Sequence, residues 1–361
     1  MTRVVVAMSG GVDSSVAAAL LKQQGYDVVG MMLTLWSEPG REGSNRCCSP
    51  DAMVLARNVA AILDIPFYAI DAKDVFRSSV VEYFLDGYLQ GITPNPCLEC
   101  NRIVRWSFLL DHALVIGADF LATGHYVRLR TVRSQNSQTK TIDQFQLMKS
   151  ADPHKDQSYI LHVLNQEQLK RAKFPVGDYH KEEVRRLADQ FGLPTASRPE
   201  SQDLCFLAGE DYREFLKRNA PESLKQGDIV DINGNHLGKH RGLSFYTIGQ
   251  RKGLKLSSTE PLFVISKNVH ENTLVVGLKD KLGRSRLEVK EVNWISGETP
   301  HGTFRAEVKI RYSASPSWAE VSPGLEGDAT LRFNEPQRDI TPGQSAVFYV
   351  GDVVVGGGII Q

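Results

Sequence analysis

The sequence predicts an α/β protein in three parts: a doubly wound parallel sheet, a small α+β linking domain and a C-terminal β-barrel. Short β-branched runs alternate with helical segments over the first part of the chain, which is typical of a parallel sheet covered by helices. A glycine-rich loop joins the first strand to the first helix. Beyond Val269 the helical period is largely lost and strands take over. We therefore expect domains at residues 1–207, 208–274 and 275–361.

Apolar runs and capping residues place the elements of the first domain. Strands are expected at residues 3–8, 27–35, 67–72 and 120–126. Gly25 is predicted to close the first helix, and Ser49 with Pro50 to begin the second. In the third helix, Ile103, Trp106, Leu110 and Leu114 share a predicted face. The helical segments are expected at 9–25, 49–66, 102–119, 165–174 and 181–192.

The later part of the chain shows the signals of strands and turns. The polar stretch 131–141 is expected to be an exposed hairpin or loop, and 227–238 a hairpin with an Asn-Gly turn. Residues 304–312 alternate strictly between apolar and charged side chains, which predicts a half-buried strand. The tail 345–360 continues in strands.

Composition excludes several classes of protein. Lys+Arg and Asp+Glu both number 42 in 361 residues, so a broadly basic nucleic-acid coat is excluded, whereas a local basic groove is not. The N-terminus lacks a signal peptide's apolar core, and no apolar run reaches the ~20 residues of a membrane span. We expect a cytoplasmic protein with no membrane partner. In that reducing compartment the five cysteines are expected to serve metal binding, catalysis or burial.

The loop AMSGGVDSS follows the first strand, where a doubly wound sheet binds anions beside a helix N-terminus. Gly10 and Gly11 permit close backbone approach, and the serines add hydroxyl donors. The loop is neither a Walker A motif nor the G-x-G-x-x-G of dinucleotide folds. A glycine pair at such a turn can also be purely structural. Asp13 is either a Mg²⁺ ligand or a first-turn acid that suits the helix dipole.

The cysteines divide into two groups. Cys47 and Cys48 have no histidine or further cysteine nearby, which predicts burial. Cys97 and Cys100 lie near the start of the third helix, where the dipole, Arg102 and Arg105 favour a thiolate. Zinc is the rival interpretation of C-x-x-C, but the sequence offers no second such pair.

Cys205 lies between Leu204 and Phe206 and taken alone predicts a small core residue.

The string SGGVDS resembles the PP-loop of ATP pyrophosphatases, whose domain is adenine nucleotide α-hydrolase-like. This resemblance implies cleavage of ATP between its α- and β-phosphates and adenylation of an oxygen. The strings SGGVDS, RCCSPDA, TPNPCLECNR, ATGHY, KDQSY and SQDLCF, in this order, are similar to those of tRNA-specific 2-thiouridylases. The likeness covers almost the whole chain. It implies that ATP with Mg²⁺ drives replacement of the C2 oxygen of the wobble uridine by sulfur.

The family's site residues fall on identifiable positions of this chain. Cys100 takes the place of the nucleophile and Cys205 that of the persulfide carrier, and the two are joined during turnover by a transient disulfide. A persulfide donor protein, a cysteine desulfurase or a relay, is the implied second partner beside the anticodon arm of tRNA. The positions implied to bind ATP are Ala7, Met8, Ser9, Gly10, Gly11, Val12, Asp13, Ser14, Leu33 and Gly124. Those implied to contact tRNA are Asn95, Pro96, Cys97, His125, Lys155, Asp156, Gln157, Arg311, Tyr312 and Gln344.

Cys97 departs from the family's pattern, because many members carry Asp at this position. With Cys100 and Cys205 it would give three ligands of an iron–sulfur cluster. The favoured interpretation is that Cys97 lines the base pocket with Asn95 and Pro96, so no firm metal site is predicted.

Two other functions compete with tRNA thiolation. A PP-loop ligase or amidotransferase synthetase for a small molecule would need the phosphate loop but neither cysteine. A non-catalytic tRNA-binding protein would keep the fold and consume no ATP. The intact phosphate loop together with both thiols disfavours each of them. The sequence predicts neither the oligomeric state nor the preferred tRNAs.

Overall fold

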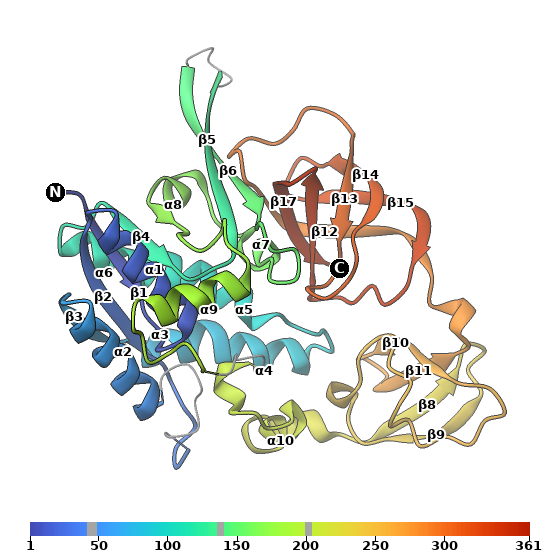
Figure 1. The fold of residues 1–361 in the computed structure, drawn as a ribbon. Helices are drawn as coiled ribbons and strands as arrows, with labels where there is room; N and C mark the ends of the chain where they lie inside the picture. The colour runs from blue at the N-terminus through green and yellow to red at the C-terminus, as the bar shows by residue number, and fades with distance from the viewer. Residues whose placement is uncertain (42–48, 136–140, 199–203) are drawn as a thin grey trace.

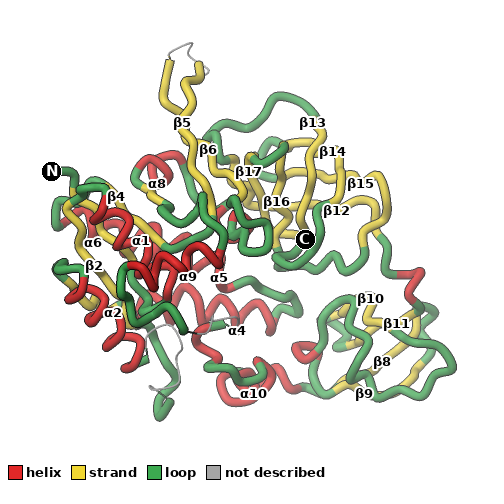
Figure 2. Tube along the Cα trace, viewed as in Figure 1, coloured by secondary structure: helices red, strands yellow, loops and turns green. Residues whose placement is uncertain are grey.

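The computed structural model describes residues 1–41, 49–135, 141–198 and 204–361. Three parts follow one another along the chain (Figure 1). Helices are concentrated in the first of them, whereas strands dominate the other two (Figure 2). Cys47 and Cys48, which the sequence predicts to be buried, lie outside the described residues. Within the described residues, no helix is both long and apolar enough to cross a membrane.

A five-stranded parallel sheet forms the centre of the first part. Its order is β3-β2-β1-β4-β7, with neighbours in parallel register. The first four strands confirm the prediction, and the fifth joins the edge beside β4. The strands are β1 (Arg3–Ala7), β2 (Asp27–Thr34), β3 (Phe67–Asp71), β4 (Phe120–Thr123) and β7 (Ala172–Lys173). The chain crosses from one half of the sheet to the other between β1 and β4, and such a switch point is where doubly wound sheets bind ligands.

Helices cover both faces of this sheet. One face packs on α1 (Val12–Gln23), α2 (Pro50–Ile62) and α9 (Lys181–Gln190). The α2 cap confirms the prediction, because the Ser49 Oγ accepts a hydrogen bond from the Ala52 amide at 3.2 Å. On this face Val4, Val6 and Val16 are fully buried.

The opposite face is covered by a helix that differs from the prediction. It begins six residues early, as α5 (Pro96–Glu99), continues as a π-helical segment Cys100–Leu109 and ends as α6 (Leu110–Val115). The wider π winding rotates the buried face. Trp106 and Leu110 are buried as expected, but Leu114 is 38% exposed and Leu109 is buried in its place.

Two further segments differ from the sequence prediction. Residues 165–174 do not form one helix: α8 (Gln166–Lys170) ends before β7. Residues 73–89, which the sequence analysis left without an element, are helical, with α3 (Lys73–Phe76), a π-helical turn Arg77–Val81 and α4 (Glu82–Leu89). Their apolar side chains form a separate cluster with Phe206 and Phe215.

The second part is a small β unit. After α7 (Ser158–Leu161) and α9 in the first part, α10 (Tyr212–Asn219) leads into it. Its four strands pair in the order β10-β11-β8-β9 around a core that includes Ile229, Val264 and Leu274. The predicted hairpin is present as β8 (Gly227–Asp231) and β9 (His236–His240). The other two strands are β10 (Phe263–Asn268) and β11 (Thr273–Gly277).

The third part is a closed barrel. Six strands pair in the order β12-β15-β14-β13-β16-β17, and β17 returns to β12. The alternation predicted for 304–312 holds over residues 304–309, because Ala306 and Val308 are buried and Arg305 is exposed. The strand ends at Lys309, and Tyr312 is 45% exposed instead of facing the core. The strands are β12 (Arg284–Trp294), β13 (Phe304–Lys309), β14 (Ser317–Pro323), β15 (Ala329–Gln337), β16 (Ser345–Val350) and β17 (Val353–Ile360).

The barrel sheet also contains strands from the first part of the chain. The stretch expected to be a hairpin or loop is a hairpin of β5 (Val127–Gln135) and β6 (Thr141–Lys149). Met148 of β6 pairs with Val353 of β17. Nearby, the Tyr159 hydroxyl donates to the Ser345 carbonyl oxygen at 2.9 Å. The barrel is therefore joined to the first domain through both backbone and side chains.

Candidate functional site

A cavity of about 610 Å³ lies beside the switch point of the parallel sheet. The loops that follow β1 and β4 form one wall, and Tyr312 reaches it from the barrel side. Most residues named from the sequence line this cavity. They are Ala7, Met8, Ser9, Gly11, Val12, Asp13, Ser14, Leu33, Pro96, Cys97, Cys100, Gly124, His125, Lys155, Gln157, Cys205 and Tyr312.

The glycine loop forms one end of the cavity, which we call the phosphate end. Gly10 has φ +67°, and a Cβ there would lie 2.4 Å from the Ala52 carbonyl oxygen, so the position requires glycine. Gly124 lies directly against the start of α1, because its Cβ would lie 2.6 Å from the Ser14 amide nitrogen. The Ser14 Oγ accepts a hydrogen bond from the Ser9 amide at 3.2 Å. These contacts hold the loop in one conformation.

Asp13 has partners that the sequence did not suggest. The Lys181 Nζ lies 2.6 Å and 2.8 Å from its two carboxylate oxygens. The Tyr126 hydroxyl donates to the same carboxylate at 2.6 Å. The Lys181 side chain is only 10% exposed, so its ammonium group is held inside the wall. The negative charge of Asp13 is therefore neutralised within the loop.

The electrostatics of the cavity favour an anion. Among the described residues that line it, Arg105, Lys155, Lys181 and Arg198 are cationic, and Asp13 is the one acid. Arg198 also donates to the Gly10 carbonyl oxygen, which links the strand–helix turn to the end of the first domain. An excess of positive charge beside backbone amides suits a polyphosphate.

The other end of the cavity, the thiol end, holds the three cysteines of the described part of the chain. Cys97, Cys100 and Cys205 are half-buried and all line the cavity. Cys100 and Cys205 pack against the same apolar cluster, which contains Phe76 and Phe206. Two cysteines 105 positions apart in the sequence thus face one space. Within the part of the chain that the structure describes, no group of three or more His, Cys, Asp or Glu side chains is arranged to hold a metal ion.

The helix bearing Cys97 and Cys100 begins earlier than predicted. The Asn95 Oδ1 caps it by accepting from the Cys97 amide at 3.2 Å. Cys97 therefore lies in the first turn, whereas the Cys100 amide already donates to the Pro96 carbonyl oxygen. The unsatisfied amides of a helix N-terminus lie in its first turn, so the dipole acts more directly on Cys97 than on Cys100. Cys205 opens a short 3₁₀ turn, Cys205–Leu207.

The residues predicted to contact tRNA differ in burial and in their hydrogen-bond partners. His125 is buried, and its Nδ1 lies 2.7 Å from the Thr123 Oγ1. Burial, with a smaller contribution from the Arg105 charge, holds the pKa of His125 well below its usual value. The Gln157 Oε1 accepts from the Tyr126 amide at 2.9 Å. His125 is therefore a neutral imidazole in the cavity wall.

Five residues named from the sequence do not line the cavity: Gly10, Asn95, Asp156, Arg311 and Gln344. Asp156 accepts hydrogen bonds from the amides of Ser150 and Ser158 and shapes the turn that presents Lys155. Arg311 donates to the Ile248 carbonyl oxygen at 3.2 Å, and Gln344 donates to the Thr93 carbonyl oxygen at 2.8 Å. In this structure these side chains support the loops around the site.

Sequence reasoning missed Lys181, Arg198 and Tyr126. Tyr126 adjoins the predicted His125, so its place at the end of the predicted strand 120–126 was an available signal. Lys181 and Arg198 follow ordinary helix and turn patterns, and only the tertiary fold brings them to the phosphate loop.

The switch-point cavity and the glycine loop define the class of α/β nucleotide-binding domains, and family models agree. Residues 2–209 match a model described as tRNA methyl transferase HUP domain. Residues 213–278 match the tRNA methyl transferase PRC-barrel domain, and 284–360 the aminomethyltransferase beta-barrel domain.

Curated relatives narrow this class to one family. The chain is 47% identical over 362 residues to tRNA-specific 2-thiouridylase MnmA 1 of Caldanaerobacter subterraneus subsp. tengcongensis, covering 99% of this chain and 98% of the relative. It is 48% identical over 360 residues to tRNA-specific 2-thiouridylase MnmA of Moorella thermoacetica, covering 99% of each. The chain belongs to the family of tRNA-specific 2-thiouridylases.

A solved 4-thiouridine synthetase–RNA complex with bound ATP is also similar, with 16% identity and a TM-score of 0.37, covering 61% of this chain and 51% of that chain.

Proposed function

We propose that this chain is an ATP-dependent tRNA-uridine 2-sulfurtransferase that converts the wobble uridine to 2-thiouridine. One observation carries the proposal: the glycine phosphate loop and two cysteine-bearing segments line a single cavity. A small-molecule synthetase of this fold leaves both thiols without a role. In the proposed division of labour, residues 1–207 bind ATP and catalyse, 208–274 form a central unit, and 275–361 contact tRNA.

ATP supplies the leaving group. The C2 oxygen of uracil is a poor leaving group, and its attack on the α-phosphate converts it to AMP while pyrophosphate departs. Lys181 and Arg198 lie where they would stabilise charge on the phosphates. Among the described residues that line the cavity, Asp13 is the one carboxylate that would hold Mg²⁺. Because Lys181 already neutralises it, phosphates and water would complete the shell of the ion. When bound, the ion would further neutralise the phosphates.

The thiols supply sulfur. In the proposed step, the terminal sulfur of a Cys205 persulfide attacks C2 and AMP leaves. The Cys100 thiolate then attacks the Cys205 sulfur, and the sulfur–sulfur bond of the persulfide breaks. Two electrons from the cysteines reduce the transferred sulfur, so a Cys100–Cys205 disulfide remains and an external dithiol must reduce it. Such a transient disulfide suits a reducing compartment, and we propose that the enzyme acts in the cytoplasm.

The substrate reaches the site beside the barrel. Tyr312 is 45% exposed and lines the cavity, and the Lys309 ammonium lies 5.4 Å from its ring centre. An exposed aromatic ring backed by a cation is suited to stacking on an unpaired base. Lys155 lines the same cavity from the loop before α7. Because the net charge is zero, affinity must come from these local cations, so tRNA binding should weaken steeply as salt rises.

The decisive experiment separates ATP use from sulfur transfer. Cys100→Ser and Cys205→Ser are each incubated with ATP, Mg²⁺, a persulfide source and unmodified tRNA. We expect both variants to bind ATP as the wild type does and to form no 2-thiouridine in digested nucleosides analysed by mass spectrometry. Full thiolation by either variant would refute the assignment. The wild-type chain, purified anaerobically and assayed for iron and acid-labile sulfide, tests our proposal that Cys97 lines the base pocket rather than holding a cluster.

A further inference from the structure

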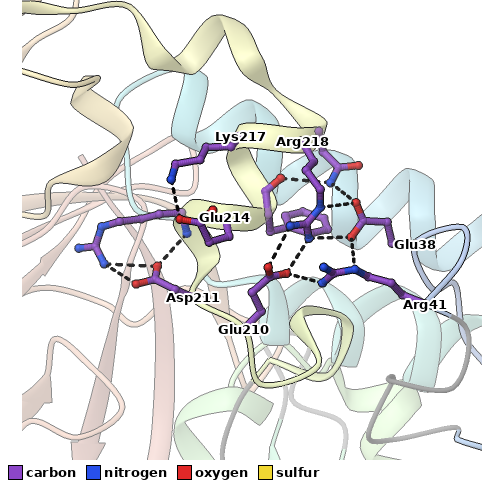
Figure 3. Close-up of polar contacts among 10 residues, drawn as sticks. Glu38, Arg41, Glu210, Asp211, Glu214, Lys217 and Arg218 are labelled. Carbon is purple, nitrogen blue, oxygen red and sulfur yellow. Dashed lines mark hydrogen bonds and ion pairs between the residues drawn. The ribbon is translucent and has the colours of Figure 1, made fainter.

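A charged cluster lies behind the thiol end of the cavity. Arg218, near the end of α10, contacts two carboxylates at once (Figure 3). Its Nε and one terminal nitrogen lie 2.8 Å from the two oxygens of Glu38. Its terminal nitrogens also lie 2.9 Å and 2.6 Å from the oxygens of Glu210. A guanidinium that binds two carboxylates through paired hydrogen bonds fixes both in position and orientation.

Arg41 and Asn219 complete the cluster. Arg41 donates to the Glu210 carboxylate at 2.6 Å, and the Asn219 amide donates to Glu38 at 3.2 Å. The Glu38 and Glu210 side chains are 15% and 22% exposed. Hydrogen bonds from Arg218 hold the pKa of both carboxyl groups below their usual range. Both carboxylates are therefore charged and paired within a partly water-shielded network, in which geometry is better fixed than in an exposed ion pair.

The two carboxylates belong to two different segments that line the cavity, one after β2 and one after Cys205. Glu38 lies three positions after Leu35, which lines the cavity at the end of β2. Glu210 follows the turn that begins at Cys205, and its amide donates to the Leu207 carbonyl oxygen at 2.9 Å. Ala208 and Gly209 between them have φ of 57° and 83°. The chain thus reverses sharply after the cysteine, and Arg218 holds the far side of that reversal.

We infer that Arg218 is a positioning residue that, through Glu210 and Glu38, fixes the Cys205 turn relative to the cavity wall and so sets the distance over which Cys205 meets Cys100. This inference rests on the proposed roles of the two cysteines. Phe206 anchors one side of the turn, with its ring centre 5.2 Å from that of Phe84. Arg218 anchors the other side. The turn that follows Cys205 is therefore held on two sides.

The test measures how readily the two thiols meet, without tRNA or ATP. The full chain is equilibrated with glutathione buffers, in which two protein thiols and one glutathione disulfide give the Cys100–Cys205 disulfide and two reduced glutathiones. Acid quenching, alkylation and peptide mass spectrometry give the equilibrium constant, which is the effective concentration of one thiol at the other. We expect Arg218→Met to lower it about tenfold, the effect of losing charge-assisted hydrogen bonds, and Arg218→Lys to restore part of it.

A matched control is available on the same helix. Arg213 has a 35% exposed side chain against 34% for Arg218. Its ion pair is to Asp211, two positions earlier, and its guanidinium also donates to the Phe245 carbonyl oxygen at 3.2 Å, so it contacts neither Glu38 nor Glu210 in the described contacts. Arg213→Met should therefore leave the equilibrium constant unchanged. Glu38→Gln weakens the contact between Arg218 and the loop after β2 while Arg218 and Arg41 both stay with Glu210, so it tests the inference even if Arg218→Met does not fold. In thiolation assays both informative variants should lower kcat and leave the KM for ATP unchanged.

The outcomes separate the inference from the proposed function. Folded Arg218→Met and Glu38→Gln variants with the wild-type equilibrium constant would overturn the positioning role and leave the proposed function intact. A wild-type chain that forms no Cys100–Cys205 disulfide in any glutathione buffer would overturn the proposed sulfur-transfer step, and the inference with it.

Discussion

The two ends of the cavity are built differently. The phosphate end consists of backbone at the switch point of a parallel sheet, with Gly10 and Gly124 allowing contacts too close for any side chain. Its Asp13–Lys181 pair is internal and already neutralised. The thiol end consists of side chains on a π-helical segment and a short 3₁₀ turn, held from behind by Arg218. The phosphate end is therefore a rigid backbone site suited to polyphosphate, whereas the thiol end depends on a turn that side-chain contacts hold in place.

The largest effect is expected at the phosphate end from Lys181→Met. It leaves the Asp13 carboxylate, 31% exposed, beside the phosphates without its ammonium partner. Removing one partner of a fully buried pair costs about 3–5 kcal/mol, and partial exposure of Asp13 reduces this to about 2–3 kcal/mol. We expect ATP affinity, measured by calorimetry, to fall about 30–100-fold. Unchanged ATP affinity would show that Lys181 only stabilises the fold, and Lys170→Met on α8 is the control.

The next largest effect is expected from Gly124→Ala, which tests whether the close contact between Gly124 and the start of α1 is required for ATP binding. The new Cβ would lie 2.6 Å from the Ser14 amide nitrogen and 2.7 Å from the Asp13 carbonyl carbon, so α1 must shift. Overpacking of this kind costs about 1–3 kcal/mol, and we expect lower stability to urea together with weaker ATP binding. Gly238→Ala, whose Cβ meets only the Leu256 side-chain end at 3.0 Å, is the control. Normal ATP binding by Gly124→Ala would mean that α1 and the phosphate loop accommodate the added methyl group without a change in the site.

Tyr312→Ala addresses the substrate at the barrel side of the cavity. Loss of base stacking on an aromatic ring costs about 1–3 kcal/mol, and the 45% exposure of Tyr312 favours the low end of this range. We expect tRNA binding in filter assays to weaken about fivefold while ATP affinity stays unchanged. Tyr312→Phe should restore binding. Equal losses of tRNA and ATP affinity would contradict the division between the two ends.

The smallest effect concerns His125, which lines the same cavity. Its folded pKa lies well below the usual value of 6.5 because the ring is buried, so folding favours the neutral form. This contribution to stability is fully present above pH 6.5 and is lost as the pH falls from 6.5 towards the folded pKa. Melting temperature followed from pH 8 to pH 5 should fall less steeply for His125→Asn than for the wild type. The same pH dependence of melting temperature in the variant and the wild type would disprove the lowered pKa of His125. A substitution of the exposed His270 provides the control variant.

The phosphate loop could be predicted from sequence because its determinants are contiguous. One strand, two glycines and a helix start specify it locally. The contact of Lys181 with this loop could not be predicted from sequence, because Lys181 lies 168 positions from its partner Asp13. The residues around Lys181 show only an ordinary helix start. The roles of Cys100 and Cys205 at the thiol end were predicted from the family resemblance and not from the local residue pattern. Hydrophobic spacing predicted an α-helix there and missed the π winding, since apolar periodicity assumes 3.6 residues per turn.

The junction between β6 and β17 has a consequence during synthesis. Met148 pairs with Val353, about 200 residues later in the chain. At a translation rate of roughly 5–20 residues per second, the β5–β6 hairpin waits roughly 10–40 s for its partner strand. Throughout that time one edge of β6 is unpaired and open to other chains. Arg128, Arg130 and Arg133 on β5 give the waiting hairpin positive charge, which discourages association with another copy of the same hairpin.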